Sequence, residues 1–258
     1  MKDIRSMISK PIGLGTASLQ PYLDVRQSRQ VLYAALDAGI TYFDTSPRYR
    51  FSENFLGKYL PERSDMIIAT KVGLDPLRTS AASLIRDQVK TRIKAHLKRR
   101  SQRPEAPKEA MVNPSITYDF GSFQNSVERP LRILRREALD VLHVHEPENI
   151  INLEELLDWI NVKIQSGLVR YRGLAIHRFG NNLLQTSFDD DIIWQFPWAQ
   201  KDLFANKCRS PIIFGAGKFL HGDGEPVRNL DAIIQETNPA IVLTQTCDCR
   251  HLKWVRNL

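Results

Sequence analysis

Four ionisable side chains stand at or just after the ends of short apolar segments, and their types suit proton transfer. A tyrosine phenol has a pKa of about 10, which is too high for easy proton exchange near neutral pH. A lysine ammonium beside the phenol favours the phenolate and lowers that pKa. A carboxylate can hold the lysine in place, and an imidazole can donate a hydrogen bond to a reacting oxygen. In chain order these residues are Asp44, Tyr49, Lys71 and His145.

Eight short apolar segments, mostly separated by helical patterns, must position these residues. Near-continuous apolar strands that alternate with helices predict a parallel sheet buried on both faces. The expected strands are 11–17, 40–45, 66–73, 139–146, 170–176, 191–196, 211–216 and 240–245. The expected helices are 29–39, 52–60, 123–137, 152–167, 227–237 and one that begins near Arg250. Eight strands in about 250 residues predict an α/β fold, the (β/α)8 TIM barrel.

A doubly wound open sheet is the alternative architecture, but no G-x-G-x-x-G follows the first expected strand. In a barrel, side chains that do chemistry lie at the carboxyl ends of strands and in the loops just after them. The sequence therefore predicts that the four ionisable residues meet at one mouth of the barrel. Two local details are also expected: Ser52 caps the helix 52–60, and Pro130 kinks the helix 123–137 or lies in its first turn.

The chain of 258 residues is expected to form one domain, 1–258, in which 74–118 is an insertion after the third strand. The insertion has too few apolar residues for a core of its own, and 90–108 carries eight Lys or Arg against one Glu. The net charge of +7 fits an anionic partner such as a phosphate-bearing cofactor. No recognisable nucleic-acid module and no aromatic interleaving of the basic residues are present, so no nucleic-acid partner is expected.

The sequence also limits location and covalent cross-linking. No apolar run approaches the length of a membrane span, and the N-terminal residues lack the apolar core of a secretory signal. A cytoplasmic location is therefore the default expectation, with no membrane partner. Three cysteines, Cys208, Cys247 and Cys249, do not indicate a disulfide framework.

Five stretches, taken in order, are similar to those of one known family. They read "GLGTA" (13–17), "DAGITYFDTSPRYRFSENFLG" (37–57), "IIATKVG" (67–73), "SVERPLRILRREALDVLHVHEPE" (126–148) and "GLVRYRGLAIHRF" (167–179). Through them the chain resembles the aldo-keto reductase superfamily. The resemblance covers nearly the whole chain, and it is specific in the first half and weak in the last third. It implies an NAD(P)H-dependent reductase that converts a small aldehyde or ketone to an alcohol.

The resemblance also implies the role of each residue. Tyr49 would be the general acid, Lys71 would lower its pKa, Asp44 would hold Lys71, and His145 would orient the carbonyl. NADPH is expected in preference to NADH, because Arg250 and Lys253 lie near the implied phosphate site. The residues expected to contact the cofactor are Thr16, Asp44, Ala175, Gln195, Phe214, Thr246, Arg250 and His251.

The chain departs from the family pattern at several positions. Arg50 stands after the tyrosine, where the family often has glycine. Many members hold the nicotinamide carboxamide with Ser-Asn at the end of strand five, where this chain has Ala175-Ile176. That contact is then lost or comes from the backbone, and Gln195 fits the glutamine that usually shares the task. The sequence ends at Leu258, inside the last expected helix.

Two other functions fit parts of the sequence. His143-x-His145 on a barrel strand places two imidazoles on one face, as in metal-dependent hydrolases. Only His177 is an obvious further ligand, and that function leaves Tyr49 and Lys71 without a role, so no metal is expected. A non-catalytic or weakly active nucleotide-sensing barrel is the other alternative, suggested by the altered strand-five contacts.

Overall fold

The computed structural model describes residues 4–19, 24–74, 120–177, 191–204, 208, 211–220 and 226–258. Except for Leu74, the expected insertion 74–118 lies outside the described residues, so its basic helix stays a prediction. The single-domain assignment of 1–258 stays a prediction for the same reason. All statements below about contacts concern the described ranges.

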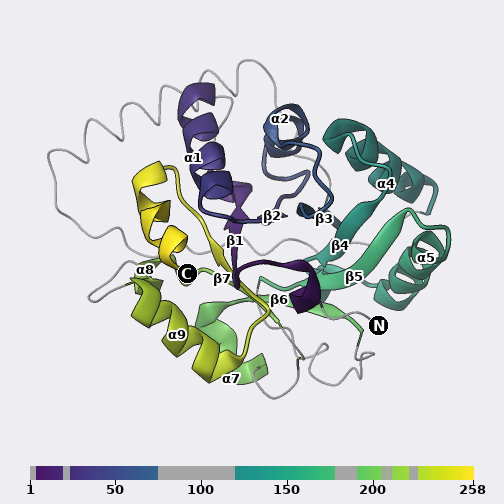
Figure 1. Cartoon of the computed structure of the whole chain (residues 1–258). Coiled ribbons are helices and arrows are strands. Elements are labelled where there is room, and N and C mark those ends of the chain that lie inside the picture. Colours follow the sequence, from purple (N-terminus) through teal and green to yellow (C-terminus); the bar gives the residue numbers. More distant parts are fainter. Residues whose placement is uncertain are drawn as a thin grey trace, which may run out of the picture.

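Eight parallel strands close into a barrel (Figure 1). Each strand pairs with the next along the chain, and the circle is completed by β1 and β8 through Ile12 beside Val242 and Leu14 beside Thr244. The strands are β1 Ile12–Gly15, β2 Tyr42–Asp44, β3 Ile67–Val72, β4 Leu139–His145, β5 Val169–Ala175, β6 Ile193–Pro197, β7 Ile212–Phe214 and β8 Ile241–Thr244. This closure confirms the predicted (β/α)8 barrel and rules out the open sheet.

Helices surround the strands, as Figure 1 shows for α1, α2, α4, α5 and α9. The α-helices are α1 Val25–Asp37, α2 Ser52–Tyr59, α4 Phe120–Leu134, α5 Leu153–Gln165, α7 Lys201–Phe204, α8 Gly217–Leu220 and α9 Pro226–Thr237. The 3-10 helices are η1 Ile4–Met7, η2 Thr16–Ser18, η3 Pro147–Asn149, η4 Trp198–Gln200 and η5 Cys249–Asn257. Every helix predicted outside the insertion has a counterpart, and the one expected near Arg250 is the 3-10 helix η5.

Local capping explains where the helix ends differ from the predictions. Helix α1 begins four residues earlier than expected, because the Asp24 carboxylate accepts a hydrogen bond from the backbone N–H of Gln27 at 2.9 Å. Ser52 is not the N-cap of α2, which is Phe51 in the left-handed region. The Ser52 hydroxyl instead donates to the Tyr49 carbonyl. Pro130 lies inside α4 rather than in its first turn.

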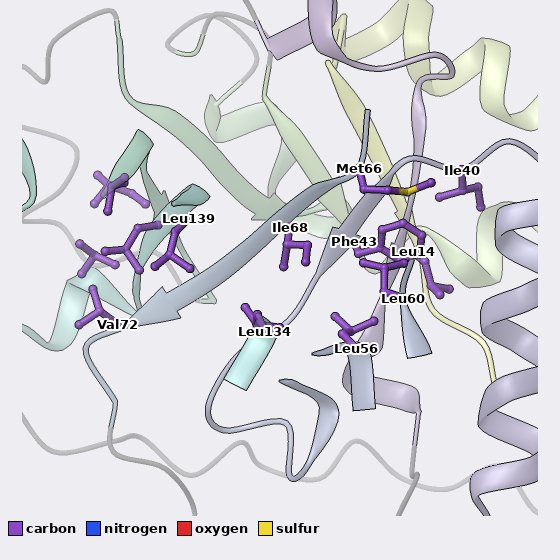
Figure 2. Packing of buried hydrophobic residues seen from close by; sticks show 14 of the residues in the cluster. Leu14, Ile40, Phe43, Leu56, Leu60, Met66, Ile68, Val72, Leu134 and Leu139 are labelled. Carbon is purple, nitrogen blue, oxygen red and sulfur yellow. The ribbon is translucent and has the colours of Figure 1, made fainter. Parts of the chain in front are cut away.

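An outer apolar layer fills the space between the strands and the helices. Side chains at alternate strand positions, such as Phe43 and Ile68, point away from the barrel axis and are buried. Figure 2 shows them among Leu56 of α2 and Leu134 of α4. Burying one such side chain contributes about 1.5–3 kcal/mol to folding, which makes this layer a major source of the scaffold's stability.

A second apolar layer fills the interior of the barrel. Its members come from inward-facing strand positions and include Tyr42, Val141 and Ile212, all fully buried. The N-terminal helix η1 adds Ile4 to this layer, so it covers the amino-terminal end of the barrel. At the opposite end of the barrel, where the strands finish, polar side chains such as Asp44 and Lys71 are buried.

No helix among the described residues has the length and apolar character needed to cross a bilayer. The three cysteines are free thiols.

Candidate active site

A buried ion pair lies at the carboxyl end of the barrel. The Lys71 ammonium donates to Asp44 Oδ1 at 2.7 Å and to the Thr45 carbonyl at 2.9 Å. The two charged side chains are only 2% and 1% exposed. Burial alone lowers the pKa of Lys71, but the Asp44 carboxylate and the Tyr49 phenol outweigh it and leave the pKa raised. The lysine is therefore held as a charged ammonium.

Tyr49 is placed by a turn between β2 and α2. Its backbone N–H donates to the Ser46 carbonyl at 2.9 Å, and its own carbonyl accepts from the Ser52 hydroxyl. The Lys71 Nζ lies 4.9 Å from the centre of the Tyr49 ring. Burial raises the pKa of the Tyr49 phenol, and the Lys71 charge opposes that rise without reversing it. The expected lowering by lysine is thus present but smaller than the effect of burial.

His145 reaches the same point from the end of β4. Its ring is 6.2 Å from the Tyr49 ring, centre to centre, in an edge-on arrangement of 86°. The Ser46 Oγ lies 3.3 Å from the imidazole Nδ1. Burial, followed by the charges of Lys71 and Arg48, holds the pKa of His145 well below its usual range. The imidazole is therefore neutral near pH 7, so one nitrogen can donate a hydrogen bond and the other can accept one.

A cavity of about 360 Å³ opens beside these side chains at the mouth of the barrel. Tyr49, Lys71 and His145 line it, as the sequence predicted, and Asp44 lies just beneath, paired with Lys71. The other lining residues are Ala17, Arg48, Leu74, Glu146, Ala175, Ile176, His177, Gln195, Phe214 and Gln245. Nine of the thirteen lining residues stand at or within three residues after a strand end, which is where barrel enzymes carry their chemistry.

Three of the predicted cofactor residues, Ala175, Gln195 and Phe214, line this cavity. Gln195 donates to Asp44 Oδ1 at 3.1 Å, while its own Oε1 is buried without a hydrogen-bond partner. Near the end of β5, the Ala175 carbonyl accepts from the Glu146 N–H and the Ile176 N–H donates to the Gln195 carbonyl. These two backbone groups are therefore already used within the barrel.

Thr16 does not line the cavity. Its hydroxyl donates to the Asp44 carbonyl at 2.9 Å, and Thr16 is completely buried. This hydrogen bond therefore holds the carboxyl end of β2, where Asp44 is the last residue. Gly15, just before it, has no space for a side chain, since a Cβ there would lie 2.8 Å from Gln245.

The other three predicted cofactor residues form a separate cluster after β8. The Thr246 hydroxyl lies 2.9 Å from His251 Nδ1, and Arg250 pairs with Asp248 through both carboxylate oxygens. None of the three is among the described residues that line the cavity. The Arg250–Asp248 pair was not anticipated, and it occupies Nε and Nη2 of the guanidinium.

His143 lies two residues before His145 on the same face of β4 and is completely buried. Neither ring nitrogen has a hydrogen-bond partner among the residues that the structure describes, and burial followed by the Lys71 charge holds the pKa of His143 well below its usual range. The ring occupies the space over Gly173, where a Cβ would lie 2.3 Å from His143 Nδ1. Within the described ranges, no group of three or more His, Cys, Asp or Glu side chains could hold a metal ion.

A model of the Aldo/keto reductase family matches residues 11–180, about two thirds of the chain. The chain belongs to the aldo/keto reductase family. The match includes all four predicted acid–base residues and β1 to β5. The resemblance inferred from the sequence is therefore confirmed.

Curated relatives match nearly two thirds of this aldo/keto reductase. The aldo-keto reductase YhdN of Bacillus subtilis is 28% identical over 173 residues, which are 64% of this chain and 42% of the relative. The aryl-alcohol dehydrogenase [NADP(+)] of Phanerodontia chrysosporium is 25% identical over 170 residues, which are 64% of this chain and 36% of the relative. The matches thus span less than half the length of these curated relatives.

Solved structures support the fold of the aldo/keto reductase over nearly its whole length. A holo-form aldo-keto reductase from Bacillus halodurans superposes with a TM-score of 0.64 at 20% identity. That superposition covers 96% of this chain and 85% of the other. At this identity, the likeness concerns the barrel and not its substrate.

Sequence reasoning missed several residues that line the cavity of this aldo/keto reductase. Arg48 precedes Tyr49 directly, and that adjacency was the signal that could have drawn attention to it. Gln245 follows β8 at its carboxyl end and had the same positional signal. Ser46, which contacts His145 but does not line the cavity, had no such signal, because its contact depends on how the turn folds.

Proposed function

We propose that this chain reduces an aldehyde or ketone to an alcohol with a nicotinamide cofactor, and that Tyr49 donates the proton. The observation that carries the proposal is the buried Lys71–Asp44 pair directly beside the Tyr49 ring, with a neutral His145 facing the same cavity. A metal-dependent hydrolase would leave this pair without a role. The Phanerodontia chrysosporium relative, an aryl-alcohol dehydrogenase, supports an oxidoreductase acting on small molecules.

The nicotinamide, when bound, supplies a hydride to the carbonyl carbon and is oxidised as the carbonyl is reduced. Tyr49 then gives its phenolic proton to the oxygen, which completes the alcohol. Burial keeps Tyr49 protonated before the reaction, and the fixed Lys71 charge stabilises the phenolate that forms. Neutral His145 has one nitrogen near Ser46, which leaves Nε2 to bind the carbonyl oxygen.

The residues at the mouth fit a nicotinamide. Gln195 lines the cavity and keeps a buried, unpartnered Oε1 that can accept a hydrogen bond from the carboxamide. Phe214 lines the same cavity and offers an apolar ring face. Gln195 would hold the carboxamide, and its hydrogen bond to Asp44 would link that contact to the ion pair beside Tyr49.

NADPH is the proposed cofactor, in preference to NADH. Arg250 and Lys253 are exposed cations after β8, and the relative from Phanerodontia chrysosporium is named for NADP(+). A 2′-phosphate would have to compete with Asp248 for Arg250. Arg250 can still bind it, because its side chain is 76% exposed and its guanidinium has donors beyond those facing Asp248.

Binding and turnover can be tested separately. Titration of tryptophan fluorescence with NADPH and NADH measures binding, and NADPH-dependent reduction of small aldehydes measures turnover. We expect Tyr49→Phe to bind NADPH like the wild type and to lose turnover by a factor of about 10² to 10⁴. Tyr33→Phe is the matched control, since Tyr33 lies exposed on α1. Full turnover in Tyr49→Phe would refute the role of Tyr49, and no cofactor binding would refute the reductase.

A further inference from the structure

Ser46 connects the turn that carries Tyr49 to the imidazole of His145. Its Oγ accepts a hydrogen bond from the Arg48 backbone N–H at 3.1 Å, and its carbonyl accepts one from the Tyr49 backbone N–H at 2.9 Å. The same Oγ lies 3.3 Å from Nδ1 of His145. Ser46 is only 1% exposed, and a buried hydroxyl is expected to use its hydrogen in a hydrogen bond.

The position of the Ser46 hydrogen follows from the contacts of its oxygen. A serine hydroxyl carries one hydrogen and two lone pairs, and one lone pair already accepts from the Arg48 backbone. Among the residues that the structure describes, the other hydrogen-bond contact of Oγ is Nδ1 of His145. If Nδ1 carried the ring proton, the Ser46 hydrogen would be buried without an acceptor, which is costly. If Nδ1 is unprotonated, the hydroxyl donates to it and both groups are satisfied.

His145 is neutral, so only one of its ring nitrogens carries a proton. Burial, followed by the charges of Lys71 and Arg48, holds the pKa of this imidazole well below its usual range. With Nδ1 accepting from Ser46, the single ring proton lies on Nε2. The ring lines the cavity beside Tyr49. It therefore presents a hydrogen-bond donor, and not a lone pair, to the oxygen of a bound carbonyl.

We propose that Ser46 is a positioning residue that holds His145 in the tautomer with its proton on Nε2. Reduction of a carbonyl places negative charge on its oxygen, and a fixed N–H donor stabilises that charge. The other tautomer would present a lone pair to the same oxygen and repel it. Ser46 is not among the described residues that line the cavity, so it acts through His145. The effect on turnover rests on the proposed reductase function, whereas the tautomer is a property of the chain alone.

Nuclear magnetic resonance reads the ring proton directly. In protein labelled with ¹⁵N on histidine, a protonated ring nitrogen differs strongly in chemical shift from an unprotonated one. A His145→Ala variant identifies the signals of His145 among those of the six histidines. At pH 7.5 and without cofactor, we expect the wild type to show Nε2 protonated and Nδ1 unprotonated.

Variants then assign the tautomer to Ser46. Ser46→Ala removes the hydroxyl, so the Nδ1 signal should move toward that of a protonated nitrogen as both tautomers become populated. Ser46→Thr keeps a hydroxyl and should restore the wild-type signals. Ser52→Ala is the matched control: it removes a hydroxyl that donates to the Tyr49 carbonyl in the same turn, and it should leave the His145 signals unchanged. If Ser46→Ala does not fold, as judged by circular dichroism, Ser46→Cys replaces it, since a thiol is a weak donor.

Steady-state kinetics measures the consequence for the reaction. With NADPH and a small aldehyde, Ser46→Ala should lower kcat/KM by about two- to tenfold, the effect of losing one net hydrogen bond. The dissociation constant of NADPH should stay at the wild-type value, because the cofactor does not depend on this tautomer. Ser46→Thr should recover most of the lost kcat/KM.

The possible results separate the tautomer from the reductase. A proton on Nδ1 in the wild type, or on both nitrogens, overturns the inference. An unchanged tautomer in Ser46→Ala assigns it to another group, and a changed tautomer with unchanged kcat/KM removes the positioning role; either result overturns the part played by Ser46. If no aldehyde is reduced, the proposed reductase fails, while the ¹⁵N signals still decide which nitrogen Ser46 leaves protonated.

Discussion

Gln195 on β6 donates to Asp44 on β2 at 3.1 Å, a hydrogen bond that crosses the interior of the barrel. The same carboxylate oxygen also accepts from the Lys71 ammonium at 2.7 Å. Asp44 therefore contacts both Lys71, which lies beside the Tyr49 phenol, and Gln195, which we assign to the carboxamide of the cofactor. Changes at Asp44 should affect both.

Removing one partner of the Asp44–Lys71 pair should reduce both stability and turnover. Lys71→Met leaves a carboxylate buried without its counter-ion, which costs about 3–5 kcal/mol of unfolding free energy. It should also lower turnover by a factor of about 10² or more, since the phenolate loses its adjacent charge. Asp44→Asn should impair turnover less, because the Lys71 side chain remains beside the Tyr49 ring. Urea denaturation and steady-state kinetics with NADPH measure the two effects.

The double variant Asp44→Asn/Lys71→Met separates the two effects. With neither charge present, we expect it to recover most of the lost stability and to remain inactive. Recovered activity would contradict the assigned role of Lys71. If the double variant is no more stable than Lys71→Met, the unpaired Asp44 carboxylate is not the cause of the lost stability.

Gly57 allows α2 and α4 to approach closely. A Cβ at this position would lie 1.9 Å from the Ile133 carbonyl oxygen, so Gly57→Ala must push the helices apart. We expect a loss of about 1–3 kcal/mol, measured by urea denaturation. Gly217→Ala is the control, because Gly217 opens α8 and has nothing within 4 Å of its added Cβ. Equal stability of the two variants would disprove the close approach.

Buried His143 should make stability fall in mild acid. Burial holds the pKa of His143 below that of an unfolded histidine, so below about pH 6.5 the unfolded chain binds a proton that the folded chain does not. Folding is then weakened by about 1.4 kcal/mol for each pH unit, down to the folded pKa. Asp44 and Glu53 act in the opposite direction, because burial raises the pKa of each carboxyl.

His143→Leu isolates the histidine from these carboxyls. Urea denaturation between pH 7.5 and 5 should show that the wild type loses stability more steeply than the variant, with a difference that begins near pH 6.5. Parallel curves would mean that His143 is protonated in the folded chain.

Asp248 should limit the preference for NADPH. It accepts hydrogen bonds from the Arg250 side chain and also caps η5 through the Arg250 backbone N–H. Asp248→Asn keeps an oxygen for the cap and removes the charge that holds the guanidinium. We expect the ratio of NADH to NADPH dissociation constants to rise by about fivefold. Asp248→Glu, which keeps the charge, is the control, and an unchanged ratio in Asp248→Asn would remove Arg250 from the phosphate site.

The strands were predictable because each is a short, nearly continuous apolar run. That pattern arises when both faces of a parallel strand are buried, as Phe43 faces the helices and Tyr42 the interior. The ends were less exact: the expected strand 211–216 is Ile212–Phe214 in the structure. The start of α1 was missed because its cap, Asp24, lies outside the apolar pattern.

At the candidate site, chain position predicted which side chains meet but not what each one contacts. Tyr49 lies in the loop after β2, Lys71 near the end of β3 and His145 at the end of β4, so the pairing of these neighbouring strands is enough to bring them together. The Gln195–Asp44 bond joins strands that do not touch, and the Arg250–Asp248 pair depends on side-chain conformation. Neither contact can be inferred from a single sequence. The raised pKa of Tyr49 depends on how deeply the ring is buried, which the residue type does not reveal.

The pairing of β1 with β8 has a consequence for the order in which the chain can fold during synthesis. Until Ile241–Thr244 has emerged, β1 and β7 each present an unpaired edge, and such edges bind other strands. The last contacts to form are also among the most distant in sequence, which slows barrel closure. A chain that stops before Ile241 would keep Asp44, Tyr49, Lys71 and His145 and still lack a barrel. We expect such a chain to be recovered as an aggregate.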